Sequence, residues 1–103
     1  MSFAVRILIS ADADAVEAAL WYDAQSPGLG AKFFEEIDLV VQRIKGNPGI
    51  YGFGFEDVRR APLPRFRFYS IYYVLRNQEA FVIAVHHSRR NPRWLRDRRK
   101  SLG

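Results

Sequence analysis

The sequence predicts an α+β domain in the order β-α-α-β-β-β, with a helix hairpin on one face of a sheet and a basic C-terminal tail. Two stretches with the apolar spacing of helices, 11–25 and 31–46, are separated only by Ser-Pro-Gly-Leu-Gly. Segments rich in β-branched and aromatic residues follow between residues 58 and 87. Helices and strands that are segregated along a chain in this way are typical of a sheet covered on one face by helices.

A first strand and a first helix are expected before the Pro-Gly turn. The segment "FAVRILIS" at 3–10 places apolar side chains at alternate positions, which predicts a strand with one well-buried face. The alanine-rich segment 11–25 predicts an amphipathic helix, in which Trp21 and Tyr22 pack within the helix hairpin. The apolar strand face consists of Phe3, Val5, Ile7 and Ile9, and the two stripes on the helix are Val16, Ala19 and Leu20 beside Ala15, Ala18 and Tyr22.

A second helix is expected over residues 31–46. Pro27 cannot continue the first helix, and Gly28 and Gly30 loosen the backbone, so a short turn joins the two helices. Gly-Asn-Pro-Gly at 46–49 is a strong stop signal. The apolar stripe with spacing i, i+4, i+7 and i+11, which is expected to face the sheet, consists of Phe33, Ile37, Val40 and Ile44.

Three strands are expected in the second half of the chain. They cover 58–63 ("VRRAPL"), 65–75 ("RFRFYSIYYVL") and 80–87 ("AFVIAVHH"). Arginines alternate with phenylalanines at the start of the middle segment, and both of its faces then become apolar, as expected for a central strand. The polar stretch 76–79 is a turn that makes the last two strands a hairpin.

Length and composition are those of one domain, 1–103. Of the 103 residues, 49% are hydrophobic and 15% are aromatic, which argues against disorder. The N-terminal stretch lacks the charged region and the cleavage site of a signal peptide, and no apolar run approaches the ~18 residues that a membrane span needs. A soluble protein of the cytoplasm, without membrane partners, is therefore expected.

Neither a metal nor a cofactor is expected. The chain has no cysteine, which excludes disulfides and thiolate metal sites. Its two histidines, His86 and His87, are adjacent and therefore point to opposite faces of a strand, so they cannot form one site together. Asp97 is the only carboxylate that follows in their basic segment, which leaves any metal site incomplete.

The C-terminal segment carries most of the positive charge. Residues 86–103 contain seven basic residues and one acid, a net charge of +6, whereas residues 1–45 have a net charge of −3. This asymmetry indicates an anionic partner, either nucleic acid or an acidic protein segment, with a solvated tail as the alternative. Trp94 and Leu95 interrupt the basic run and indicate that the tail, 88–103, docks on the domain with its arginines outward.

Four stretches together resemble the RelE/ParE superfamily of toxins from type II toxin–antitoxin modules, also called plasmid-stabilisation proteins. The stretch "WYDAQSPGLGAKFFEEI" looks like the family's first helix, Pro-Gly-Leu-Gly turn and second helix, and "IKGNPGIYG" looks like its Asn/Pro stop. The stretch "VRRAPLPRFRFYSIYYVL" looks like its arginine-bearing hairpin, and "AVHHSRRNPRWLRDR" looks like its last strand and basic tail. The resemblance covers most of the chain and implies the family fold, a two-helix hairpin packed on a curved antiparallel sheet.

The resemblance implies a toxin that a cognate antitoxin holds inactive, and the family acts in two ways. RelE-like members enter the ribosome and cut mRNA without a metal, whereas ParE-like members bind DNA gyrase and trap it on broken DNA. In the nucleolytic branch the strand matching "YSIYY" usually carries an arginine, but here Ser70 stands at that place. That branch also often ends in a tyrosine or histidine beyond the last strand, whereas here no tyrosine follows Tyr73 and the tail reads Asn-Pro-Arg-Trp. These departures favour the ParE-like branch. A ribosome-dependent endoribonuclease, or a member that only binds its antitoxin, is the alternative.

Two sets of residues are candidates for these roles. In an endoribonuclease, arginines would stabilise the phosphate and His87 would transfer protons; the alternative for His87 is a structural imidazole, hydrogen-bonded between sheet and tail. Tyr69, Tyr72 and Tyr73 are expected in the core and the sheet rather than as a platform for base stacking. The catalytic candidates are Arg59, Arg60, Arg65, His87 and Arg90. The candidates for binding an antitoxin or a target are Arg59, Arg60, Arg67, Arg89, Arg90, Arg93, Trp94 and Arg96.

Overall fold

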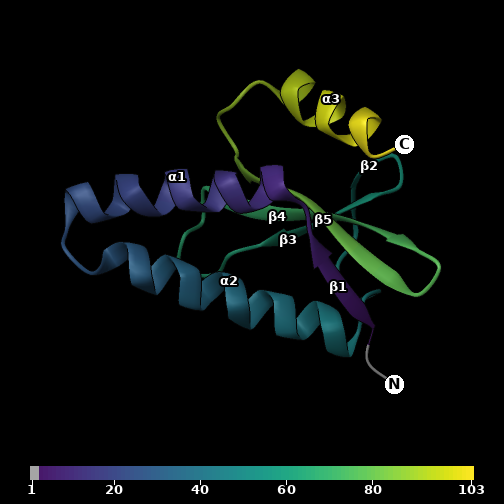
Figure 1. The fold of residues 1–103 in the computed structure, drawn as a ribbon, viewed down its shortest axis with the longest axis horizontal. Coiled ribbons are helices and arrows are strands. Elements are labelled where there is room, and N and C mark those ends of the chain that lie inside the picture. Colours follow the sequence, from purple (N-terminus) through teal and green to yellow (C-terminus); the bar gives the residue numbers. More distant parts are fainter. Residues whose placement is uncertain (1–2) are drawn as a thin grey trace.

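The computed structural model describes residues 3–103; Met1 and Ser2, the first residues of the domain expected over 1–103, lie outside the described residues. Five strands form one sheet in the order β1-β5-β4-β3-β2 (Figure 1). The strands are β1 (Ala4–Ile7), β2 (Phe53–Phe55), β3 (Val58–Pro62), β4 (Tyr69–Arg76) and β5 (Glu79–His87). The helices are α1 (Ile9–Gln25), α2 (Leu29–Gly46) and α3 (Pro92–Leu102).

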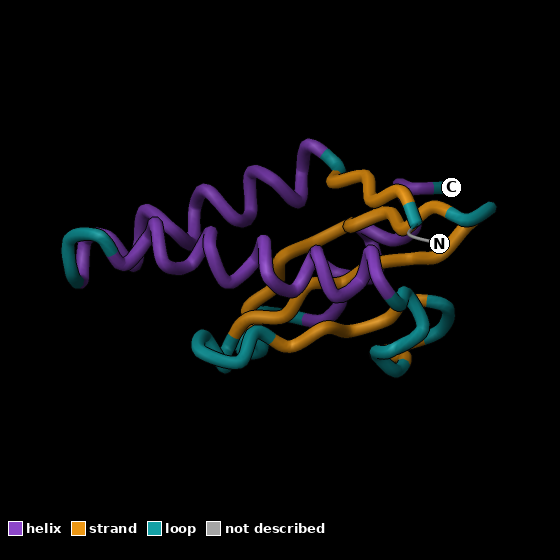
Figure 2. Tube along the Cα trace, turned by 90° about the horizontal axis from the view of Figure 1, so that it is seen from below, coloured by secondary structure: helices purple, strands orange, loops and turns teal. Residues whose placement is uncertain are grey.

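The α+β class and the helix hairpin on the sheet are confirmed, and the expected elements occur in the expected order. Figures 1 and 2 show α1 and α2 side by side, with the tip of their hairpin projecting beyond the sheet. The sheet is mixed rather than wholly antiparallel, because β1 pairs with β5 in parallel, which the intervening helices allow. Two elements are additional: β2 lies in the glycine-rich passage and α3 in the basic tail.

Strand β1 lies at the edge of the sheet and is shorter than expected. Its ladder partner is β5 on one side, and Ile7 is 47% exposed. Ile9 already belongs to α1 and is 90% exposed. The prediction of a well-buried face over 3–10 is therefore wrong for these two side chains. The alternation of apolar residues is the same in an edge strand and in a central strand, so the pattern alone cannot tell one from the other.

The main core lies between the sheet and the helix hairpin. The predicted apolar stripe of α2 is confirmed, since all four of its side chains are buried. Helix α1 presents four buried alanines, whose small side chains let the helix lie close to its neighbours. The turn between the helices depends on Gly30, because a Cβ there would lie 2.6 Å from the carbonyl oxygen of Ala19. The backbone N–H of Gly30 donates to Asp23 Oδ1 at 2.7 Å and closes the turn.

The chain between β3 and β4 is a loop, so the prediction of a strand from residue 65 onward is wrong for 65–68. The backbone N–H of Arg65 donates to the buried carboxylate of Glu36 at 2.7 Å, and Phe66 turns into the core, where 8% of it is exposed. These contacts with α2 replace the hydrogen bonds of a strand. The β4–β5 hairpin is confirmed, and its two turn residues have φ values of 50° and 63°, as in a type I′ turn.

Helix α3 packs on the opposite face of the sheet from α1 and α2. Leu95 is 4% exposed and belongs to a second, smaller core with Tyr72, Val74 and Ile83. Successive residues of a strand point to opposite faces, so Ile71 contributes to the main core and its neighbour Tyr72 to the smaller one. Within residues 3–103, no helix is long and apolar enough to cross a membrane.

Candidate functional site

The basic tail is a docked helix, as its Trp-Leu pair predicts. Asn91 caps α3, since its Oδ1 accepts the backbone N–H of Arg93 at 2.9 Å, and a proline follows at the first helical position. Trp94 stacks on His86, with ring centroids 5.2 Å apart and an interplanar angle of 21°. Leu95 is buried beside it. The predicted docking through Trp94 and Leu95 is confirmed.

Arg98 fastens α3 to the rest of the molecule. Its guanidinium donates to Asp14 at 2.9 and 3.2 Å and to the carbonyl oxygen of Ile83 at 2.8 Å. Asp14 Oδ2 also accepts the backbone N–H of Val85 at 3.1 Å. The two side chains of this pair are only 14% and 9% exposed. Because Arg98 also lies 4.3 Å from the ring centroid of Trp94, its charge is committed to the docking of the helix.

Arg99 makes a second, bidentate ion pair. Its Nε and Nη2 donate to the two carboxylate oxygens of Asp57, at 2.9 and 2.7 Å. The hydrogen bond from Arg99 lowers the pKa of Asp57, and the same bond raises the pKa of Arg99. Asp57 lies in the turn between β2 and β3, so this pair ties the end of α3 to that turn. The expectation that the tail arginines point outward is therefore wrong for two of the six, Arg98 and Arg99, because acids from α1 and from the β2–β3 turn bind them.

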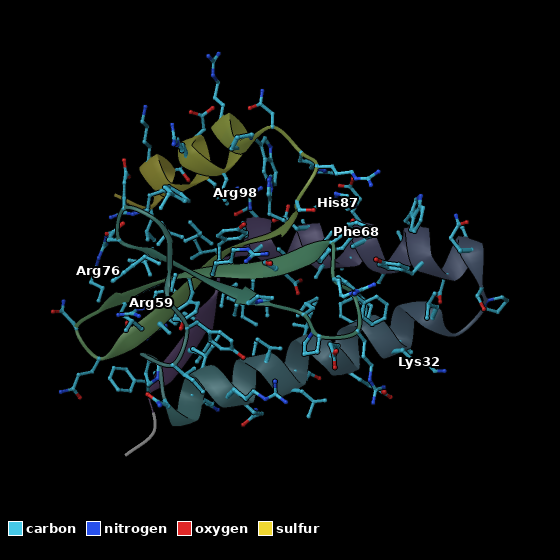
Figure 3. The ribbon with its side chains drawn as sticks, turned by 180° about the vertical axis from the view of Figure 1, so that it is seen from behind. Lys32, Arg59, Phe68, Arg76, His87 and Arg98 are labelled. Atoms are coloured by element: carbon cyan, nitrogen blue, oxygen red, sulfur yellow. The ribbon has the colours of Figure 1, made fainter. Side chains whose placement is uncertain are left out.

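A different group of charges lies where β4 begins and β5 ends. A hollow of about 270 Å³ there is lined by Trp21, Tyr69, His87, Arg89 and Arg90. Figure 3 shows Phe68 and His87 side by side at this end of the sheet. Their rings are stacked, with centroids 5.5 Å apart and an interplanar angle of 13°, and the guanidinium of Arg89 lies 5.2 Å from the centroid of Phe68.

A second hollow of about 580 Å³ adjoins the first. Trp21 borders both of them, and Phe68 borders the second while it stacks on His87 of the first. None of the residues that line the two hollows is acidic. The exposed cationic and aromatic side chains of the two linings, together with His87, form one surface, called here the cationic–aromatic surface. It consists of Trp21, Lys32, Arg65, Arg67, Phe68, His87, Arg89 and Arg90.

The side chain of His87 accepts a hydrogen bond from the start of the tail. Its Nδ1 accepts the backbone N–H of Arg89 at 3.0 Å, just beyond the end of β5. A neutral imidazole that accepts through Nδ1 carries its proton on Nε2, so His87 presents a donor to its surroundings and not a free base. This bond is the one expected of a structural imidazole between the sheet and the tail. Among residues 3–103, no three His, Asp or Glu side chains are grouped as metal ligands would be.

The structure brings only part of the catalytic candidate set together. His87 and Arg90 line one hollow and Arg65 lines the adjoining one. Arg59 donates to the carbonyl oxygen of Tyr51 at 2.6 Å and lies at the other end of the sheet, as Figure 3 shows. Its ladder partner on β4 lies four residues from the partner of His87, which corresponds to about 13 Å along the strand. Arg60 is exposed on the face of the sheet opposite to that of Arg59, beside Tyr72.

Ser70, the position at which the sequence resemblance implies an arginine in nucleolytic members, is covered. Ser70 is 3% exposed and pairs across the ladder with His86, which is 4% exposed and lies under Trp94. Burial lowers the pKa of His86, and its Nδ1 has no hydrogen-bond partner among the described residues. Because α3 packs over this part of the sheet, a phosphate does not reach Ser70 without movement of the helix.

The partner-binding candidates fall into three groups. Arg67, Arg89 and Arg90 belong to the cationic–aromatic surface. Arg93 and Arg96 border a hollow of about 630 Å³ along α3. The others are placed differently: Arg59 and Arg60 lie on β3, and Trp94 is part of the docking contact. Lys32 and Phe68 were not predicted as site residues. The prediction that Trp21 packs within the hairpin is wrong, since Trp21 is 58% exposed. For Trp21, the signal in the sequence was a large aromatic residue close to the Pro-Gly turn between the helices.

Helix α1 carries an apolar stripe on its outer side. Ile9, Val16 and Leu20 are 90%, 43% and 66% exposed, and their spacing of seven and four residues places them on one side of the helix. The expectation that Val16 and Leu20 pack inward is therefore wrong. Both sides of this helix are apolar, and the alanine side packs because it permits the closer approach.

The comparisons with known proteins concern the fold. No family model and no curated protein matches the chain. Among solved structures, the chain is similar to one from the "Chromosomal ParDE TA system from P. aeruginosa", with a TM-score of 0.72 and 19% sequence identity. The match covers 84% of this chain and 96% of that chain. The two chains therefore share a fold, and the fold that the sequence resemblance implies is confirmed.

Proposed function

We propose that this chain is the toxin of a type II toxin–antitoxin module and that a cognate antitoxin neutralises it. The observation that carries the proposal is the fold shared with a chain of a ParDE TA system over nearly the whole of that chain. The four sequence stretches that resemble the toxin superfamily also support it. They lie in the helix hairpin, at the end of α2 and in the loop after it, in β3 and β4, and in β5 and α3.

The surface offers two features that suit an antitoxin segment. The outer stripe of α1, with Ile9, Val16 and Leu20, presents apolar anchors at helical spacing to an amphipathic partner. Arg90 lies beside that helix, since it pairs with Glu17 of α1 at 2.8 Å, and Arg89 is its neighbour. An antitoxin that lays apolar side chains on α1 therefore has cations within reach for its acids.

For the toxic action we propose binding to DNA gyrase, without catalysis by this chain. Three observations support a binding role. Ser70 is buried under α3, His87 uses Nδ1 to accept a backbone hydrogen bond, and Arg59 lies at the other end of the sheet from His87. A nuclease needs a base, phosphate ligands and an acid around one phosphate.

The alternative is a ribosome-dependent endoribonuclease. The observation that favours it is the hollow that His87 and Arg90 share with Tyr69, with Arg65 next to it. Entry into the ribosome would have to release Nδ1 of His87 from Arg89 before the imidazole could act as a base.

Two measurements on the intact chain separate these functions. The first is induction in bacteria without an antitoxin, with growth recorded and RNA 5′ ends mapped; growth arrest without new ends inside codons is the expected result. The second is a gyrase supercoiling assay with micromolar protein, in which inhibition is expected. New ends that disappear in His87→Ala and Arg90→Ala variants would replace the gyrase proposal by the endoribonuclease. Normal growth together with unimpaired gyrase would contradict toxicity itself.

A further inference from the structure

The outward side of α3 carries a stripe of exposed cations. Arg93, Arg96 and Lys100 follow one another at spacings of three and four residues, which places them on one side of the helix. Leu95 lies on the other side and packs against the sheet. All three cations are exposed, and within residues 3–103 none of them forms a salt bridge. These three side chains are called here the α3 stripe.

The α3 stripe is held in one orientation, because the helix itself is fixed. Arg98 and Arg99 bind Asp14 and Asp57 on the side of the helix that faces the rest of the molecule. Figure 1 shows α3 on the outside of the molecule, away from the helix hairpin. The 11 residues of α3 span about 16 Å. Cations on a fixed helix lose little conformational freedom when a partner binds.

Arg60 continues the positive charge across the sheet beside α3. Its ladder partner, Tyr72, belongs to the smaller core with Leu95, so both strand side chains point to the α3 face. The guanidinium of Arg96 lies 6.0 Å from the ring centroid of Phe55 on β2, the strand next to Arg60. Arg60 is exposed, and it too has no salt bridge within residues 3–103.

Two acids lie beside the α3 stripe. Glu56 and Asp97 border the same hollow of about 630 Å³, and within residues 3–103 neither forms a salt bridge. The α3 stripe and Arg60 carry four positive charges against these two negative ones, a net charge of +2. The first 45 residues, which include the helix hairpin on the opposite face, have a net charge of −3. The field of the molecule therefore turns its α3 face toward a polyanion.

We propose that the α3 face binds double-stranded DNA without sequence preference, with α3 along the major groove and phosphates held by the α3 stripe and Arg60. The major groove of B-DNA admits an α-helix, and contacts with phosphates carry no sequence information. The major groove of double-stranded RNA is too narrow to be entered in this way, so DNA should be preferred. This binding goes beyond the proposed function, since it needs neither antitoxin nor gyrase.

Other anionic partners are less suited to the α3 face. A single strand gains affinity from bases that stack on exposed rings, and the α3 stripe contains no aromatic side chain. An acidic helical peptide needs apolar contacts as well as charge, and the apolar side of α3 is already buried against the sheet. A duplex presents regularly spaced phosphates and requires neither rings nor apolar contacts.

The binding assay uses the full chain and four fluorescein-labelled probes: two 12-base-pair DNA duplexes of unrelated sequence, a 12-base-pair RNA duplex and a 12-residue Glu-rich peptide. Fluorescence anisotropy should give Kd values within twofold of each other for the two DNA duplexes. The Kd values for the RNA duplex and the peptide should be at least fivefold higher. The affinity for DNA should fall with salt by roughly 0.9 log units per log salt for each phosphate contact.

Matched variants separate the α3 face from net charge. The double variant Arg93→Gln/Lys100→Gln should raise the Kd for DNA at least tenfold and reduce the salt slope by roughly 0.9 for each cation removed. The control is Arg43→Gln/Lys45→Gln, which removes one arginine and one lysine from the exposed end of α2 and should leave the Kd within twofold. All four side chains are exposed, so both variants should fold, as circular dichroism checks.

Asp97→Asn changes the affinity in the opposite direction. Asp97 lies four residues after Arg93 on α3, so its loss removes a negative charge next to the α3 stripe. The variant should bind the DNA duplexes at least twofold more tightly. Unchanged or weaker binding would contradict the placement of phosphates at the α3 stripe.

Three further results would each overturn the proposal. They are equal losses in the two double variants, a Kd for the RNA duplex or the peptide no higher than that for DNA, and a preference of more than tenfold between the two DNA sequences. The first would show that net charge alone attracts the duplex, and the second would assign the α3 face to another partner. The third would show that base edges are read.

Discussion

The tail contains two groups of arginines that are close in the sequence but differ in their contacts: one group is bound in ion pairs that hold α3, and the other faces the surface. Arg98 and Arg99 are bound by Asp14 and Asp57 and hold α3 on the sheet. Arg89, a few residues earlier, forms no salt bridge within residues 3–103 and lies beside Phe68. The sequence does not distinguish these arginines from one another. In the folded chain, some stabilise the structure and others are exposed where a partner could contact them.

Burial distinguishes the Arg98–Asp14 pair from the Arg90–Glu17 pair. The Arg98–Asp14 pair is largely removed from water and each partner has further hydrogen bonds, so removing one partner leaves a buried, uncompensated charge. The Arg90–Glu17 pair is exposed, so water and salt screen it. The same ion pair chemistry therefore has a large effect on stability at one site and a small one at the other.

The largest effect is expected for Asp14→Ala. It leaves Arg98 and the backbone N–H of Val85 without their acceptor, and the free energy of unfolding should fall by about 3–5 kcal/mol. Urea unfolding followed by circular dichroism measures the loss. Glu17→Ala is the matched control on the same helix and should cost less than about 1 kcal/mol. Equal losses in the two variants would mean that burial does not distinguish the two regions.

A smaller loss is expected for Gly30→Ala, which tests the support of the cationic–aromatic surface. The added Cβ would lie 2.6 Å from the carbonyl oxygen of Ala19, so the helix hairpin that carries Trp21 and Lys32 has to shift. We expect a loss of about 1–3 kcal/mol in the free energy of unfolding. Gly46→Ala, where a Cβ meets no atom within 4 Å, should change it by less than about 0.5 kcal/mol. No difference between the two variants would contradict the close approach.

Acid should lower the stability of the region where α3 packs on the sheet, because His86 lies there under Trp94. Burial lowers the pKa of His86 below its ordinary 6.5, so the unfolded chain binds the proton more readily than the folded one. The stability contributed by neutral His86 is complete above pH 6.5 and is lost as the pH falls through the lowered, folded pKa. Between pH 7.5 and 5.5, thermal unfolding of His86→Leu should shift less than that of the unaltered chain. An equal shift in His86→Leu and in the unaltered chain would show that another group is responsible.

The smallest effect is expected for Glu17→Gln, which frees Arg90 without removing a buried contact. The free energy of unfolding should change by less than about 1 kcal/mol, because the pair is exposed. Urea unfolding followed by circular dichroism measures the change. A loss as large as that of Asp14→Ala would show that Glu17 holds Arg90 as firmly as Asp14 holds Arg98.

The apolar periodicity of the sequence predicted the buried face of α2 but not that of α1. The stripe through Phe33, Ile37, Val40 and Ile44 has one apolar side, so its period alone identifies the buried face of α2. Helix α1 is apolar on two sides, so its period could not show that Val16 and Leu20 face outward. The candidate site was predicted only in part, because Arg90 stands out by its charge and His87 by its imidazole, whereas exposed aromatics such as Phe68 look like core residues.

By itself the sequence determined the order of α1, α2 and four of the five strands, the turn between the two helices, the turn of the β4–β5 hairpin, the excess of positive charge in the tail and the docking of that tail through Trp94 and Leu95. These features depend on residues that are near one another in the chain. Only the tertiary structure decided which charges are satisfied, because Asp14 and Arg98 are separated by 84 positions and meet only when α3 docks beside α1 and β5. Arg89, which no such partner reaches within residues 3–103, stays exposed on the surface.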